Sequence, residues 1–174
     1  VYELPVGRGR RFGTNWNRLT DALLGRWQMN GILTLQAGQP LTITTQNTSN
    51  AGGSVLRPNN NGSSAKLDGP IRSRLNRYFD SSVFSQPAPF TFGNTGRTLP
   101  DVRAQGARNL DFSLFKEFVI REQARLQFRA ESFNLPNQVQ FGFPNMVLSS
   151  GQIGIISATA NAPRQVQFGL KLLF

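Results

Sequence analysis

Strict alternation between apolar and polar residues is the feature of this sequence that most limits what the chain can fold into. The segment 164–174 reads RQVQFGLKLLF. Successive side chains of a β-strand point to opposite faces, so a period of two predicts a strand. One face of this strand is apolar throughout and carries Val166, Phe168, Leu170, Leu172 and Phe174.

Three further segments alternate in the same way, and residues 1–6 resemble the end of another strand. We therefore expect an all-β chain of antiparallel strands near 1–6, 24–45, 108–119, 124–134 and 164–174. Polar and charged residues occupy most of the positions between the apolar ones. The apolar positions of the internal strands are Trp27, Met29, Leu33, Leu35, Leu110, Phe112, Leu114, Leu126 and Phe128.

The length of these strands suits a membrane. Ten residues at about 3.4 Å each, tilted by about 40–45°, rise roughly 25 Å, the height of the apolar band of an outer-membrane barrel. A membrane helix needs about twenty consecutive apolar residues, and the sequence has no such run. Its mean hydropathy of -0.30 is compatible with strands that are apolar only at alternate positions. We expect those positions, together with Val166, Phe168 and Leu170, to face lipid, and Trp27 to lie in an interfacial aromatic girdle.

The connections between the expected strands alternate in length. The link at 121–123 is tight, whereas 46–107 and 135–163 are long. Bacterial outer-membrane barrels have short periplasmic turns and long extracellular loops. We therefore expect the two long segments to lie outside the cell, and 7–23 to be a periplasmic turn with a short helix over NRLTDALL.

About five strands are too few for a membrane barrel, because the smallest such barrels have eight. An open sheet leaves unpaired N–H and C=O groups at its edges, and each costs several kcal/mol in lipid. We expect residues 1–174 to be the C-terminal part of a larger barrel.

The segment 46–107 changes character along its length. Its first half is rich in Asn, Gly, Ser and Pro, which favour turns. The second half carries Tyr78, Phe79, Phe84, Phe90 and Phe92. Two roles are open for these aromatic residues: packing of the loop on itself against the barrel rim, or contact with a ligand.

The polar face of the strands carries charged residues that would point into the barrel. A network of interior ion pairs or a device for substrate selectivity would each account for them. These residues are Asp111, Glu117, Arg125, Arg129, Glu131 and Lys171.

The sequence argues against catalysis and against metal or cofactor chemistry. It has no Cys and no His, which removes thiolate nucleophiles, imidazole bases and Cys/His zinc sites. Glu117 and Glu122 fall at a strand end and a turn, without a cluster of metal ligands around them. We expect no enzyme, no catalytic or metal residues and no cofactor.

The net charge of +10 raises the question of nucleic-acid binding. The arginines are scattered, however, and follow no spacing of a known nucleic-acid-binding motif, so we expect no nucleic-acid partner. For RGRR at 8–11, a solvated periplasmic turn and contact with lipid phosphates are the two alternatives.

Seven segments, in order, resemble the C-terminal barrel of TonB-dependent receptors, and most closely the Oar-like subgroup, whose members begin with a carboxypeptidase regulatory-like domain. The resemblance covers nearly the whole chain. The segments are ELPVGRGRRFG, LLGRWQMNGILTLQAGQPLTI, RPNNNG, YFDSSVFSQPAPFTFGNTGR, ARNLDFSLFKEF, LQFRAESFNLPN and PRQVQFGLKLLF.

This resemblance implies a barrel of twenty-two strands in the outer membrane of a Gram-negative bacterium, filled by an N-terminal plug and energised by TonB. Such receptors import large or scarce nutrients. These residues include neither plug nor TonB box, so we expect no transport by this segment alone. The implied partners are outer-membrane lipid, the TonB system through the missing N-terminal part, and the barrel assembly machinery. The last strand resembles the signal read by that machinery, with Gln167, Gly169, Leu172 and Phe174 at its key positions.

The alternative is a protein without a transport function. It would be a secreted β-sandwich, or an adhesin or structural protein of the outer membrane that binds glycans. A sandwich has turn signals every 8–12 residues, and the long segment from Gln46 onward argues against it.

Overall fold

The computed structural model describes residues 1–48, 50–121 and 124–174. The chain divides into two compact units. The first, called the sheet unit here, comprises 1–35, 108–138 and 162–174. The second, called the loop unit, comprises 36–107 and 139–161. The tight turn expected at 121–123 includes two positions that lie outside the described residues.

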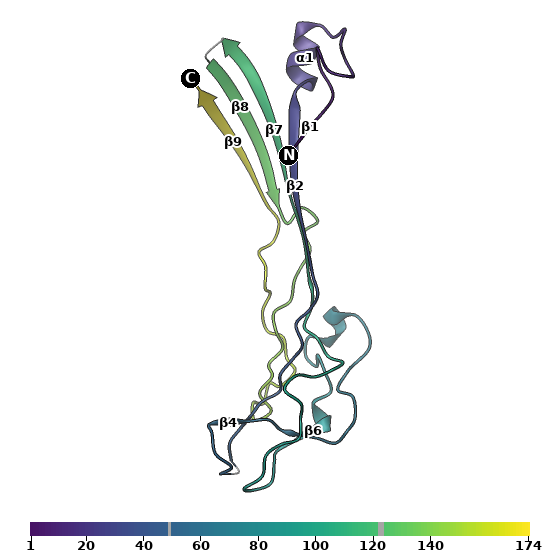
Figure 1. Ribbon diagram of the computed structural model, residues 1–174, viewed down its shortest axis with the longest axis vertical. Helices are drawn as coiled ribbons and strands as arrows, with labels where there is room; N and C mark the ends of the chain where they lie inside the picture. Colours follow the sequence, from purple (N-terminus) through teal and green to yellow (C-terminus); the bar gives the residue numbers. More distant parts are fainter. Residues whose placement is uncertain (49, 122–123) are drawn as a thin grey trace. The chain divides into compact units, whose positions relative to one another are not determined.

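A five-stranded sheet dominates the sheet unit, and its strands lie in the order β1, β2, β7, β8, β9. The pairs β1–β2, β7–β8 and β8–β9 are antiparallel. Figure 1 shows β7, β8 and β9 side by side. The bounds are β1 Tyr2–Glu3, β2 Trp27–Gln36, β7 Ala107–Arg121, β8 Ala124–Phe133 and β9 Gln165–Leu173.

The expectation of one strand over 24–45 is wrong at both ends. Leu24 closes a helix, and β2 ends at Gln36. Close packing beyond that point explains the ending: a Cβ on Gly38 would lie 1.7 Å from the carbonyl oxygen of Ala104. The next residue but one, Pro40, has no N–H to give to a strand ladder. The strand expected at 1–6 is likewise shorter, since β1 covers only Tyr2–Glu3.

The helix expected over 17–24 is confirmed as α1, Arg18–Leu24. Asn17 caps its N-terminus, because its side-chain oxygen accepts a hydrogen bond from the backbone N–H of Thr20 at 2.7 Å. In the described part of the chain, no helix has the length and apolar character needed to cross a membrane.

The loop unit has a hydrophobic core of its own, which agrees with the alternative in which aromatic residues of 46–107 pack the loop on itself. Leu41, Ile43 and Phe79 are fully buried, and Leu99 and Val102 are nearly so. Short elements surround this core. They are β3 Thr45–Gln46, β4 Val55–Leu56, β5 Asn59–Asn60, β6 Phe84–Ser85 and the 3₁₀ helices η1 Ile71–Arg74 and η2 Ser81–Val83.

Polar contacts at the edge of this core fix its turns. The hydroxyl of Tyr78 donates to the carbonyl oxygen of Arg103 at 2.7 Å. Arg74 lies over the Tyr78 ring at 5.2 Å from its centroid. Burial raises the pKa of Tyr78, and the charge of Arg74 partly opposes that rise. The phenol therefore stays protonated and keeps its bond to Arg103.

Candidate membrane-facing surface

The pairing of β8 with β9 places apolar side chains opposite one another. Leu126 lies opposite Leu172, and Phe128 lies opposite Leu170. The rings of Phe128 and Phe168 stack, with centroids 6.2 Å apart and an interplanar angle of 20°. Directly opposed and diagonal neighbours on one face are close enough to stabilise a sheet.

Strands β7 and β2 extend the same face. In β7, Leu114 lies opposite Ala130 and Phe118 opposite Leu126. The Trp27 ring of β2 meets Phe128 edge to face, with centroids 6.4 Å apart. We call this surface the apolar face, and it includes every position expected from sequence to face lipid: Trp27, Met29, Leu33, Leu35, Leu110, Phe112, Leu114, Leu126, Phe128, Val166, Phe168 and Leu170.

Much of the apolar face is exposed on this chain. Phe168 is 72% exposed, Leu170 70% and Leu35 69%. Soluble proteins rarely expose contiguous apolar surface of this kind unless it contacts a partner or a membrane. The face therefore needs an apolar environment to cover it.

The opposite face, called the polar face, carries most of the charged and amide side chains of the sheet, and many of them are hydrogen-bonded to one another. Gln127 donates to the carboxylate of Glu117 at 3.1 Å, and Arg129 donates to Gln127 at 2.8 Å. Arg125 forms an ion pair with Glu117 at 3.8 Å, and the Gln167 amide donates to Glu131.

Side-chain amides connect the charged groups of this polar face. Of the two alternatives for these charges, the network of interior ion pairs therefore takes the form of a mixed network of amide and charged groups. Asp111 accepts from the side chain of Asn109 and from the backbone N–H of Asn134. Lys171 lies opposite Gln127.

Lys116 was missed by the sequence analysis, although it lies on the apolar face. Its position in β7 is opposite Phe128, and it is 2% exposed. Its ammonium nitrogen donates to the carbonyl oxygen of Gly25 and lies 5.2 Å from the ring centroids of both Trp27 and Phe118. The signal was present in the sequence, because Lys116 interrupts the even-numbered apolar series of β7.

The residues of the expected assembly signal lie on β9, an edge strand of the described sheet. Gln167 is on the polar face and Leu172 on the apolar face. Gly169 lies opposite Arg129, and Phe174 follows the strand and is 94% exposed. The four residues therefore sit beside a strand edge that faces no neighbour among the described residues.

A ligand-contact role for the aromatic residues of the loop unit is wrong for Tyr78, Phe79 and Phe84. All three are buried in the core of that unit, where they offer no surface to a ligand. Phe79 and Phe84 meet edge to face with centroids 6.2 Å apart. Phe90 and Phe92, in contrast, are 77% and 71% exposed.

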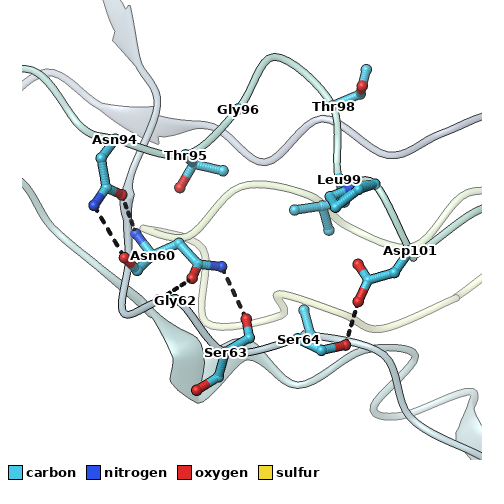
Figure 2. Close-up of a pocket in the computed structure, with 12 residues that line it drawn as sticks. Asn60, Gly62, Ser63, Ser64, Asn94, Thr95, Gly96, Thr98, Leu99 and Asp101 are labelled. Carbon is cyan, nitrogen blue, oxygen red and sulfur yellow. Dashed lines mark hydrogen bonds between the residues drawn. The ribbon is translucent and has the colours of Figure 1, made fainter.

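The loop unit also contains an open polar pocket of about 680 Å³, shown in Figure 2. Two stretches form it, around 60–65 and 94–101. Most of its polar groups already pair with one another. The Asn94 amide donates to the Asn60 carbonyl oxygen at 3.1 Å, and Ser64 donates to Asp101. Its lining carries one carboxylate and no basic side chain, so its chemistry suits neutral polar or cationic groups.

A family model described as an outer membrane beta barrel domain matches residues 1–167. No curated protein and no solved structure matches the chain.

Proposed function

Because this chain belongs to the outer membrane beta barrel domain family and is located in the outer membrane, we propose that it forms part of the barrel wall of a TonB-dependent receptor that imports a large or scarce nutrient. The supporting observation is the two-faced sheet. Its apolar face would contact lipid, and its hydrogen-bonded polar face would line the interior, as in other membrane barrels.

The edges of the sheet support a larger barrel. β1 and β9 are the outermost strands of the described sheet. Unpaired backbone groups at such edges cost several kcal/mol each in lipid. In our proposal further strands pair with both edges and close the barrel.

The Oar-like features of the sequence supply the finer part of the proposal. The loop unit would lie outside the cell and meet the nutrient first. Gln167, Gly169, Leu172 and Phe174 would present β9 to the barrel assembly machinery, and Phe174 would then lie at the periplasmic interface.

A TonB-dependence experiment tests the transport proposal. Cells that carry the full-length polypeptide would be given labelled maltodextrins, ferric chelates and peptides, with TonB present or deleted. We expect uptake of one class to require both the polypeptide and TonB. Uptake that is unchanged by deletion of TonB would contradict the proposal.

The second candidate is an outer-membrane adhesin or structural protein that binds glycans. The polar pocket of the loop unit and, separately, the exposed rings of Phe90 and Phe92 favour it, because neutral polar groups and exposed aromatic rings are both chemically suited to sugars. If deletion of this protein abolished cell adhesion to a glycan surface without any loss of uptake, that result would support this candidate. The secreted sandwich is excluded by the outer-membrane location.

A further inference from the structure

A second pocket, of about 380 Å³, lies within the sheet unit beside α1. We call it the basic pocket. Four cationic and two anionic side chains take part in its lining. The lining residues are Arg8, Arg18, Asp21, Ala22, Arg26, Lys116, Glu117, Phe118 and Val119.

The two carboxylates of the basic pocket already have cationic partners. Asp21 lies 3.9 Å from the Arg26 guanidinium. Glu117 lies 3.8 Å from Arg125. Within the described residues, the guanidinium groups of Arg8 and Arg18 form no ion pair with a carboxylate. The pocket therefore has positive charge available for an anion.

Close packing holds the backbone around this pocket in place. The backbone N–H of Arg8 donates to the Asp21 carboxylate at 2.6 Å. A Cβ on Gly25 would lie 2.5 Å from the same carboxylate and 3.1 Å from the Cα of Gly7. Only glycine permits this approach, so the turn and α1 are fixed to each other. The Cα positions of Arg8 and Arg18, from which their side chains extend, are therefore also fixed.

The basic pocket adjoins the apolar face. Lys116 and Phe118 line the pocket and also belong to that face of β7. The ammonium group of Lys116 lies 5.2 Å from the centroid of the Trp27 ring, and the Trp27 indole N–H donates to the carbonyl oxygen of Leu23 at 3.1 Å. A tryptophan with an apolar body and a bonded polar tip is typical of the boundary between acyl chains and headgroups.

We propose that the basic pocket binds a phosphate group. Guanidinium groups pair with phosphate through two parallel hydrogen bonds, and are preferred over ammonium groups where planar recognition is needed. A phospholipid could place its phosphate between Arg8 and Arg18 while its acyl chains lie on the apolar face. The inference rests on the outer-membrane location and is independent of nutrient uptake.

Lipid retention by the full-length protein tests the inference. The protein would be purified in detergent, supplied with phosphatidylglycerol, and examined by native mass spectrometry. The double variant Arg8→Gln/Arg18→Gln is expected to retain at least about fivefold less lipid than the parent, because charge-assisted bonds to phosphate are lost. Arg8→Lys/Arg18→Lys keeps the charge and is expected to restore part of the retention.

Arg10→Gln/Arg11→Gln is the matched control. It removes the same charge from the same turn, but neither residue lines the basic pocket. Retention by this variant is expected to stay close to that of the parent. An equal loss in both glutamine variants would overturn the inference, because the attraction would then be a general effect of positive charge.

Inorganic phosphate distinguishes the two sources of the anion. If the pocket takes a lipid headgroup, millimolar phosphate leaves most of the phosphatidylglycerol bound. If phosphate itself binds in a way that depends on Arg8 and Arg18, and no lipid is retained, the ligand is free phosphate. Binding of neither would refute the site. Heat-modifiability gels of the double variant and of the single variant Arg18→Gln show whether each barrel has folded, and so exclude misfolding as the cause of a loss of lipid binding.

Discussion

Lys116 and Gly25, which are 91 positions apart, are joined by a hydrogen bond from the lysine ammonium group to the glycine carbonyl oxygen. The bond fastens the C-terminal cap of α1, two residues before β2 begins, to β7. It also gives a buried charge a polar partner on a face that is mostly apolar, where an unpaired charge would be costly.

Replacement of Lys116 tests the value of that bond. Lys116→Met keeps an unbranched chain against the rings of Trp27 and Phe118 but leaves the Gly25 carbonyl oxygen without its donor. We expect the full-length protein to lose about 1–3 kcal/mol of unfolding free energy in detergent, the usual cost of an unsatisfied buried group. Lys171→Met, on the polar face, is the control and is expected to change it by less than about 0.5 kcal/mol. Equal effects would contradict a special role for Lys116.

A charge on the apolar face tests the membrane assignment. Leu170 lies near the middle of β9 and is 70% exposed. Leu170→Arg is expected to cost about 2–4 kcal/mol in a bilayer and to lower the amount of folded protein in the outer membrane. Gln165→Arg adds the same charge to the polar face of the same strand, at a position outside the assembly signal, and is expected to be tolerated. Urea titration in lipid vesicles would show the difference, and tolerance of both variants would argue against lipid contact.

The core of the loop unit gives a prediction independent of the membrane. Phe79→Ala removes a fully buried ring and is expected to destabilise that unit by about 3–5 kcal/mol. Tyr78→Phe removes only the donor to Arg103 and is expected to cost about 1 kcal/mol. Phe90→Ala, at a 77% exposed position, is the control. Limited proteolysis of intact cells would rank the three variants, and rapid cleavage of the Phe90 variant alone would contradict this order.

The pH dependence of the loop unit is expected to reflect Asp80. Hydrogen bonds from Arg77 and Ser82 lower the pKa of its carboxyl from 3.8 to about 2. A group whose pKa is lowered on folding stabilises the folded state above its unfolded pKa and loses that effect as the pH falls through the folded one. The Asp80 carboxylate therefore stabilises the folded unit by a constant amount above a pH of about 4, and this stabilisation disappears between about pH 4 and pH 2. Hydrogen exchange across that range would detect the loss, and Asp80→Asn is expected to flatten it.

Alternation in the sequence was sufficient to predict which residues share a face in β7, β8 and β9. A period of two is imposed by an environment that differs on the two sides of a sheet, so it is written into each strand locally. The placement of Phe128 and Leu170 on one face and of Arg129 and Gly169 on the other follows from it, whereas their pairing as direct neighbours is known from the structure.

The loop unit could not be predicted in the same way, because its core depends on contacts between distant segments. Leu41 donates its backbone N–H to the carbonyl oxygen of Val102, and Leu99 donates to that of Leu41. Pro40 is a local signal that β2 ends, but nothing near Leu41 shows that its side chain is fully buried. The end of that strand, the burial of Phe79 and the partner of Lys116 all depend on such distant neighbours.

The loop unit is made of two separate stretches, with the β7–β8 hairpin between them in the sequence. Ile156 of the second stretch belongs to the core itself, and Phe141, Met146, Leu148 and Ile153 of the same stretch pack against it. The first stretch therefore lacks part of its core until the hairpin and the residues after it are available. Contacts between such distant residues form slowly, because the conformational entropy of closing the long intervening chain opposes them. Completion of this unit is thus a late event in the folding of the polypeptide, and a stall after β7 would leave Leu41 and Phe79 only partly covered.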